Sequence, residues 1–195
     1  MISIHSIDEN IVYDGTQIRA LWGFEKTGIM GDSIISFAGP MKVALDEMID
    51  QKDVLKEKDK TNTPISSDLT LHFIIEHFDT HSPKIAFLRQ RILLFTTFEI
   101  LKQQVTNPAA LKREFSDIYY DTMKLTVSIA SAAPTCIKIH LGINILSTGA
   151  PDYVKIIGLR DIGVLDYKKL AKEISMSYKD EILRVEEDIC KIRPL

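Results

Sequence analysis

Residues 116–145 read SDIYYDTMKLTVSIASAAPTCIKIHLGINI, and this stretch decides the fold. β-Branched and aromatic residues are frequent in both of its halves, and the segment AAPT at 132–135 separates them. Two such runs joined by a short, turn-forming segment are typical of paired antiparallel strands. We therefore predict that residues 117–130 and 137–145 lie side by side in an antiparallel sheet.

The rest of the chain predicts further strands and helices around this pair. Short apolar, β-branched runs predict strands at 2–5, 32–37, 69–78 and 154–158. Helices are expected at 16–24, 41–50 and 85–104, with an exposed polar loop at 51–68. The clearest helix is a long amphipathic one at 166–193, where apolar residues recur every three or four positions. These elements predict one α+β domain spanning 1–195, a mixed and mostly antiparallel sheet with flanking helices.

Composition excludes several classes of protein. The chain has 195 residues, of which 45% are hydrophobic, so it can bury a core. Its net charge of −3 argues against a general nucleic-acid binder, which needs clustered Lys and Arg. The apolar runs are too short to cross a membrane, and no secretory signal is recognisable. Cys136 and Cys190 have no CxxC spacing, which indicates buried free thiols and a cytoplasmic location.

Three short motifs resemble the active-site core of the biotin and lipoate protein ligases. Asp117-Ile-Tyr119 stands at that family's Asp-containing turn, Lys124-Leu125 at its lysine, and Leu141-Gly-Ile-Asn144 at its glycine-asparagine strand. The resemblance implies a ligase-like fold, similar to class II synthetases. It also implies a catalytic Lys124 that neutralises a carboxylate and a phosphate as an acyl-adenylate forms, which makes ATP a candidate cofactor. Asp117 is then expected to orient this lysine or a ligand N–H, and Asn144 to fix a backbone turn or a ligand group.

The chain departs from those ligases where their basic, glycine-rich loop closes over the adenylate. Residues 37–41 read FAGPM, and the acidic segment DEMID follows at 46–50. Two interpretations therefore stay open. One is an enzyme that binds or transfers a small carboxylate or acyl-adenylate at Lys124. The alternative is a non-catalytic module that binds a small molecule or a partner, and a third hypothesis is a homodimer formed through the C-terminal helix.

Further side chains are candidate ligand contacts. His140 lies four residues before Asn144, so strand alternation places both on one face, in the pocket expected beside Lys124. Guanidinium groups bind carboxylate and phosphate, so the remaining anion-binding candidates are Arg19, Arg89 and Arg91. The alternatives are a hydrogen-bonded core histidine at 140, solvated arginines, and a lysine at 124 that faces solvent as we expect of Lys138.

A small group of histidines and acids follows the strand expected at 69–78. On an extended chain His77, Asp79 and His81 share one face and could offer three ligands to a metal ion. The segment lacks the H-E-x-x-H spacing of helical zinc sites, and a polar strand end is the alternative. We assign no metal to it.

Longer stretches resemble a small archaeal family of domains of unknown function. The matching segments are GDSI-x-x-F-x-GP at 31–40, LHFI-x-EHFD at 71–79, RQR at 89–91 and KIH-x-G-x-N at 138–144. This resemblance implies the same ligase-like fold and leaves the activity open.

Overall fold

The main sheet of the computed structural model has five strands in the order β1-β2-β3-β8-β7. The structure describes residues 1–51, 54–55 and 65–193. β1 (Ser3–Ile7) runs parallel to β2 (Ser33–Val43), and all other neighbours are antiparallel. The remaining strands are β3 (Ile65–His77), β7 (Thr126–Ala132) and β8 (Ile137–Asn144). The prediction of a mixed, mostly antiparallel sheet in an α+β fold is confirmed.

Residues 111–124 contribute a second, smaller sheet, so only part of the segment 117–130 pairs with β8 as predicted. It contains β4 (Leu111–Glu114), β5 (Asp117–Tyr120) and β6 (Met123–Lys124), in that order. The predicted neighbours of β8 therefore divide: β7 pairs antiparallel with β8, as expected, whereas β5 and β6 leave the main sheet. Asp121 adopts a positive φ of 55° in the turn between β5 and β6, which reverses the chain within two residues. Lys124 thus lies at the joint between the two sheets.

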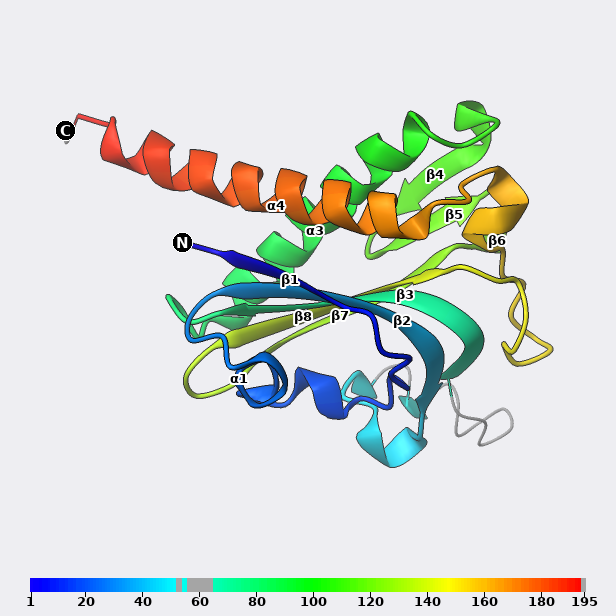
Figure 1. Cartoon of the computed structure of the whole chain (residues 1–195), viewed down its shortest axis with the longest axis horizontal. Coiled ribbons are helices and arrows are strands. Elements are labelled where there is room, and N and C mark those ends of the chain that lie inside the picture. The colour runs from blue at the N-terminus through cyan, green and yellow to red at the C-terminus, as the bar shows by residue number, and fades with distance from the viewer. Residues whose placement is uncertain (52–53, 56–64, 194–195) are drawn as a thin grey trace.

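Two long helices cover one face of the main sheet and short helical turns cover the other (Figure 1). α3 (Pro83–Lys102) begins with a proline at its first turn, where a missing N–H costs nothing. α4 (Tyr167–Cys190) begins at Asp166, whose side chain accepts a hydrogen bond from the Lys169 N–H at 2.9 Å. The opposite face carries α1 (Trp22–Thr27) and the 3-10 turns η1 (Thr16–Ile18) and η2 (Leu45–Glu47).

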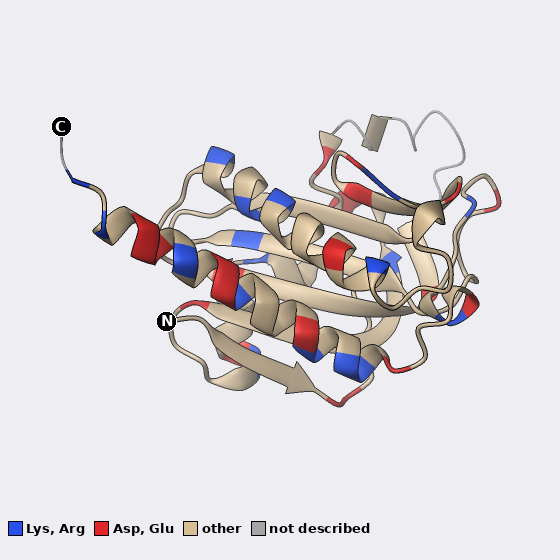
Figure 2. Ribbon diagram, turned by 90° about the horizontal axis from the view of Figure 1, so that it is seen from above, with Lys and Arg blue, Asp and Glu red and all other residues tan. Residues whose placement is uncertain are grey.

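The apolar stripe of α4 explains why this helix docks on the sheet. Its buried residues include Leu170, Ile174, Tyr178 and Ile182, whereas charged residues of both signs follow its solvent side (Figure 2). Beyond Ile182 the apolar side chains Ile189 and Ile192 are exposed. The homodimer expected through this helix stays a prediction. No helix in the described part of the chain is both long and apolar enough to span a membrane.

Strand alternation sorts the central strands into an apolar face and a polar one. Leu71, Phe73 and Ile75 of β3 belong to the core cluster under α3 and α4, as do the odd-numbered residues of β8 from Ile137 to Ile143. The intervening residues face α1 and the 3-10 turns, and they include Thr70, His72, Glu76, Lys138, His140 and Asn144, all buried. Because a buried polar group must find a partner, this second face is where chemistry is expected.

Several predicted boundaries are wrong around β2. The strand expected at 32–37 continues through Gly39 and Pro40 to Val43, because a bulge between Gly39 and Met41 accommodates the proline without a ladder hydrogen bond. The helix expected at 41–50 is instead the end of this strand followed by η2. The helix expected at 16–24 is divided into η1 and α1, because Leu21 takes a left-handed conformation between them.

Other expectations need correction as well. Residues 154–158 form no strand and contribute one isolated bridge, between Ile156 and Lys124. The loop expected at 51–68 gives way to β3 at Ile65, and residues 52–53 and 56–64 lie outside the described residues. Cys136 is a buried free thiol as expected, but Cys190 is exposed because it lies at the end of α4 beyond the sheet.

Candidate functional site

A pocket of about 150 Å³ lies on the α1 side of the main sheet, next to the joint between the two sheets. Side chains from β2, β7 and the 3-10 turns give it an apolar wall: Ile18, Met41, Val43, Met48, Val127 and Ile129. Three of the predicted site residues, Asp117, Lys124 and His140, also line it. An apolar cavity with a few convergent polar groups is the usual form of a small-molecule site.

Lys124 and Asp117 form an ion pair at one side of this pocket. Nζ of Lys124 lies 3.1 Å from Oδ2 of Asp117, and the two side chains are 29% and 21% exposed. The pairing of β5 with β6 sets this geometry, since Tyr119 is opposite Lys124 and Asp117 is two residues away on the same face. An ammonium group has three N–H donors, so one ion pair leaves donors that a ligand can use.

The backbone of Lys124 is held from three sides. Its N–H donates to the Lys155 carbonyl at 2.9 Å, and its carbonyl accepts from the Ile157 N–H at 3.1 Å. The same carbonyl accepts from Nδ2 of Asn144 at 3.3 Å. Asn144 is therefore a support that fixes the position of Lys124 and is not part of the pocket wall. Support of this kind keeps a charged group in place before a ligand arrives.

Two histidines form a hydrogen-bonded pair at the sheet side of the pocket. Nδ1 of His72 lies 3.0 Å from Nε2 of His140, and Nε2 of His72 lies 3.2 Å from the Gly39 carbonyl oxygen. The Tyr13 ring stacks on His140, with centroids 3.7 Å apart and planes at 11°. Burial lowers the pKa of His72 to about 3 and holds the pKa of His140 well below 6.5. Both imidazoles are therefore neutral at physiological pH.

Acidic side chains also line the pocket. Glu47 and Asp50 line it, and Nη2 of Arg19 lies 2.9 Å from each carboxylate oxygen of Glu47. Arg19 is thus near the site but is engaged by Glu47. In the described lining, three carboxylates face a single ammonium, that of Lys124. The lining therefore carries a net negative charge even when Arg19 is counted.

The structure does not bring Arg89 and Arg91 to this pocket, because α3 lies across the opposite face of the sheet. Both amino groups of Arg89 contact the carboxylate of Asp79, at 2.6 and 2.5 Å. Nη1 of Arg91 is buried and has no hydrogen-bond partner within the described ranges. Arg89 and Arg91 are two residues apart on a helix, so their side chains also do not share one face.

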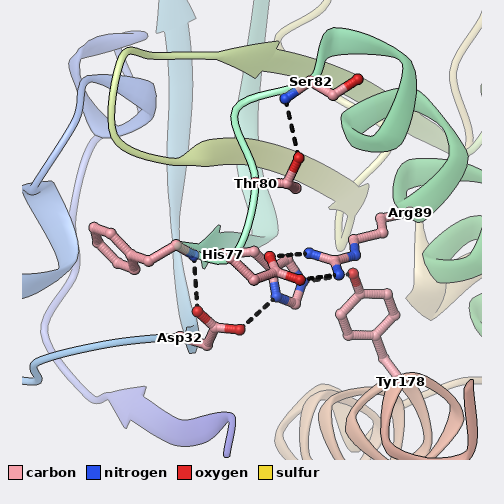
Figure 3. Close-up of polar contacts among 8 residues, drawn as sticks. Asp32, His77, Thr80, Ser82, Arg89 and Tyr178 are labelled. Atoms are coloured by element: carbon pink, nitrogen blue, oxygen red, sulfur yellow. Dashed lines mark hydrogen bonds and ion pairs between the residues drawn. The ribbon is translucent and has the colours of Figure 1, made fainter. Parts of the chain in front are cut away.

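Arg89 belongs to a polar cluster that fastens β3 to α4 (Figure 3). Nδ1 of His77 lies 3.0 Å from Oδ2 of Asp32, and Nε2 of His77 lies 2.9 Å from the Tyr178 hydroxyl. The candidate ligand atoms of Asp32, His77 and Asp79 lie within 4.8 Å of one another, whereas His81 is not part of the group. Because both oxygens of Asp79 contact Arg89 and both nitrogens of His77 have partners, the cluster is better explained as a structural tie.

The contacts that Asp32 makes in this cluster predict that the protein loses stability in acid. Burial tends to raise the pKa of Asp32, but hydrogen bonds from His77 and from the Phe78 N–H outweigh it and hold this pKa below 3.8. A depressed pKa contributes stability above the unfolded-state value, and this contribution disappears as pH falls through the folded-state value. Asp32→Asn should therefore lower the free energy of unfolding at pH 7 and lower it less at pH 3, which is below the unfolded-state pKa of 3.8. Urea unfolding at both pH values measures this, and an equal loss at both would contradict the assignment.

Several residues of the site were not found from the sequence. Tyr13, Glu47 and Asp50 come from segments whose contacts depend on the bulge in β2 and on the turns around it, whereas His72 reaches the site through its contact with His140. His72 alone had a detectable signal, since it shares a strand face with Glu76. The expectation that Lys138 faces solvent is wrong: its side chain is fully buried and forms an ion pair with Glu76. β8 is covered on both faces, so alternation could not indicate exposure there.

Comparison with known proteins shows the family of this chain. The model of the DUF366 family, a domain of unknown function, matches residues 2–193. This chain belongs to the DUF366 family. A DUF366 relative from Methanocaldococcus jannaschii, Uncharacterized protein MJ0805, is 41% identical over 194 residues, covering 100% of this chain and 86% of the relative. The archaeal family predicted from the sequence motifs is thereby confirmed.

Several solved structures are similar in fold to this DUF366 chain. A protein of unknown function from Pyrococcus horikoshi superimposes with a TM-score of 0.90 at 31% identity, covering 100% of both chains. An apo biotin protein ligase from Aquifex aeolicus gives a TM-score of 0.59 at 12% identity, covering 96% of this chain and 71% of that one. A lipoate-protein ligase A bound with ATP gives 0.57 at 11% identity, covering 92% and 85%. The ligase-like fold expected from residues 116–145 is confirmed.

Proposed function

We propose that this protein binds a small carboxylate in the pocket beside Lys124. The observation that carries the proposal is a half-buried ammonium, held from its backbone, at the wall of an apolar cavity. A charge-assisted hydrogen bond to a carboxylate is strong where water is largely excluded, and the apolar wall suits an aliphatic or aromatic tail. The ligase-like fold supports the same site, since the resemblance to those ligases assigns the carboxylate end of the substrate to this lysine.

The residues present do not fit a bound ATP in this pocket. A triphosphate is a polyanion, and the described lining offers one ammonium against the carboxylates of Asp117, Glu47 and Asp50. Arg19 is paired with Glu47 through Nη2, so this pair adds no net positive charge for a phosphate. Acidic side chains beside a polyanion cost free energy unless other charges intervene. We therefore favour the non-catalytic interpretation, in which the pocket binds its ligand without activating it.

A second candidate is adenylation of the bound carboxylate. It is favoured by the structural neighbours, one of which is a lipoate-protein ligase A bound with ATP and another a biotin protein ligase in complex with biotin and ATP. Release of pyrophosphate from ATP in the presence of a carboxylate separates the two candidates. Carboxylate-dependent release of pyrophosphate would establish an adenylating enzyme, whereas carboxylate binding without release supports the non-catalytic binding module.

Lys124→Met should weaken binding of hexanoate about tenfold or more, because the charge-assisted hydrogen bond it removes is worth roughly 1.5–3 kcal/mol. The melting temperature should change little, since a partly exposed ion pair contributes only about 0–1 kcal/mol to stability. Isothermal titration calorimetry measures the affinity and a thermal melt the stability. Lys112→Met is the matched control, because Lys112 is an exposed lysine on β4 of the same small sheet and is absent from the described pocket lining. Equal hexanoate affinity in both variants would refute the proposed site.

A further inference from the structure

The hydrogen bonds of the two buried histidines determine which nitrogens carry their protons. The Gly39 oxygen is a carbonyl and can only accept, so the contact at 3.2 Å requires Nε2 of His72 to carry hydrogen. A neutral imidazole has one N–H, so Nδ1 of His72 is an acceptor. The contact at 3.0 Å then requires Nε2 of His140 to donate to it. Nδ1 of His140 is consequently left without hydrogen, as an acceptor.

Packing holds this arrangement in place. Tyr13 stacks on His140 and also lies 5.1 Å, centroid to centroid, from the His72 ring, and Phe37 stacks on His72 with centroids 5.0 Å apart. His72 is fully buried and His140 is 2% exposed, so neither ring can turn over without opening the core. Burial lowers both pKa values, which keeps the pair neutral. The direction of the two hydrogen bonds is therefore fixed by the fold.

Nδ1 of His140 has no hydrogen-bond partner among the residues that the structure describes, although its side chain is nearly buried and lines the pocket. A ligand that donates a hydrogen bond to this atom should bind more tightly than a ligand of the same shape that cannot. Nδ1 of His140 is therefore an acceptor on a pocket-lining side chain, and a donor on the ligand would satisfy it.

We propose that the ligand of this pocket carries an N–H or O–H donor that binds Nδ1 of His140, in addition to the carboxylate that binds Lys124. The carboxylate end rests on the function proposed above, whereas the donor end rests on the two histidines alone. The ligand class is a small carboxylate with a ring N–H, amide or hydroxyl at its far end. A plain fatty acid supplies the carboxylate for Lys124 but no donor for Nδ1 of His140.

The protonation pattern can be tested without any ligand. Long-range ¹H–¹⁵N correlation spectra of the wild-type protein, with histidines assigned through His72→Phe and His140→Phe, report which ring nitrogens carry hydrogen. We expect His140 to be neutral, with Nε2 protonated and Nδ1 unprotonated from pH 6 to 8. A proton on Nδ1, or a charged ring at pH 7, would overturn the proposal. If a phenylalanine variant fails to fold, selective labelling in the remaining variant still gives the assignment.

The donor requirement is tested with isosteric probes that differ in one group. 4-(1H-Pyrrol-2-yl)butanoate carries a ring N–H, and 4-(furan-2-yl)butanoate has an oxygen in its place; linkers one carbon shorter and longer complete the series. We expect the pyrrole to bind on the order of tenfold more tightly at the best linker, and this preference to disappear in His140→Phe.

The outcomes separate this inference from the proposed function. Equal binding of pyrrole and furan at every linker sinks the donor requirement and leaves the carboxylate site standing. If Lys124→Met leaves both affinities unchanged while the pyrrole preference persists, the carboxylate site fails and the donor requirement survives. Absence of binding by all probes overturns both.

Discussion

Replacing Lys138 by methionine is expected to lower the free energy of unfolding by about 3–5 kcal/mol, because it leaves the Glu76 carboxylate buried and unpaired. The two side chains are 0% and 1% exposed, and they form an ion pair beneath α1. Oε1 of Glu76 also accepts a hydrogen bond from the Gly23 N–H at 3.1 Å. Burial lowers the pKa of Lys138, and the neighbouring Glu76 opposes this effect. The pair is therefore strongly interdependent.

A second substitution should recover most of the loss. In Lys138→Met with Glu76→Gln, the amide oxygen still accepts from Gly23 and no charge remains buried, so a buried pair replaced together costs little. Lys168→Met is the matched control, since Lys168 pairs with Asp8 on the surface and should leave the unfolding midpoint unchanged. Urea unfolding of the wild type, Lys138→Met, the double variant and Lys168→Met measures how much of the loss is recovered. A loss of the same size in the single and double variants would show that the ion pair is not the reason for the effect.

Gly39→Ala is expected to cost about 2–3 kcal/mol, near the upper end of what overpacking usually costs. A Cβ at this position would lie 1.9 Å from the Ile11 carbonyl oxygen, so the backbone itself must move. The displaced segment includes Tyr13, whose N–H donates to the Pro40 carbonyl and whose carbonyl accepts from the Lys42 N–H. Because Tyr13 stacks on His140, affinity for carboxylate probes should fall together with stability.

Gly142→Ala gives the comparison for this prediction. It lies on the same pocket face of the sheet, but an added Cβ would meet side-chain methyl groups of Thr70 and Val127 at 3.1 Å, which can yield. We expect a clearly smaller loss of stability than for Gly39→Ala. Should thermal melts rank the two variants in the opposite order, the close approach of β2 to residues 10–13 is not the constraint inferred here.

The two long helices and β8 were predictable from the sequence. α4 was expected close to its observed bounds because apolar residues recur along it every three or four positions, and α3 because it is a long apolar stretch without a breaker. β3 was expected as a strand, but it begins at Ile65, before the expected start at 69. The course of the chain from Gly39 to Glu47 was not predictable. There a bulge, which follows from pairing with β3 and from the approach of Ile11, overrides the breakers Gly39 and Pro40.

The candidate site was predictable only in part. Asp117, Lys124 and His140 could be grouped because strand alternation and the ligase-like order of motifs concern the same three strands. Tyr13, Glu47 and Asp50 could not, because they approach from segments far away in the sequence that only tertiary contacts bring to the pocket. Lys138 was misjudged for a related reason, since a strand covered on both faces gives no outward position.

The most direct test of carboxylate binding beside Lys124 uses the methionine methyl groups as reporters. Of the six methionines in the chain, Met41 and Met48 line the pocket, whereas Met30 and Met176 are exposed elsewhere. Methyl spectra of ¹³C-methionine-labelled protein are recorded during titration with hexanoate. We predict saturable shifts of the Met41 and Met48 resonances, with Met30 and Met176 unmoved, and loss of these shifts in Lys124→Met. Saturating shifts at Met176 with Met41 and Met48 unchanged would contradict the site.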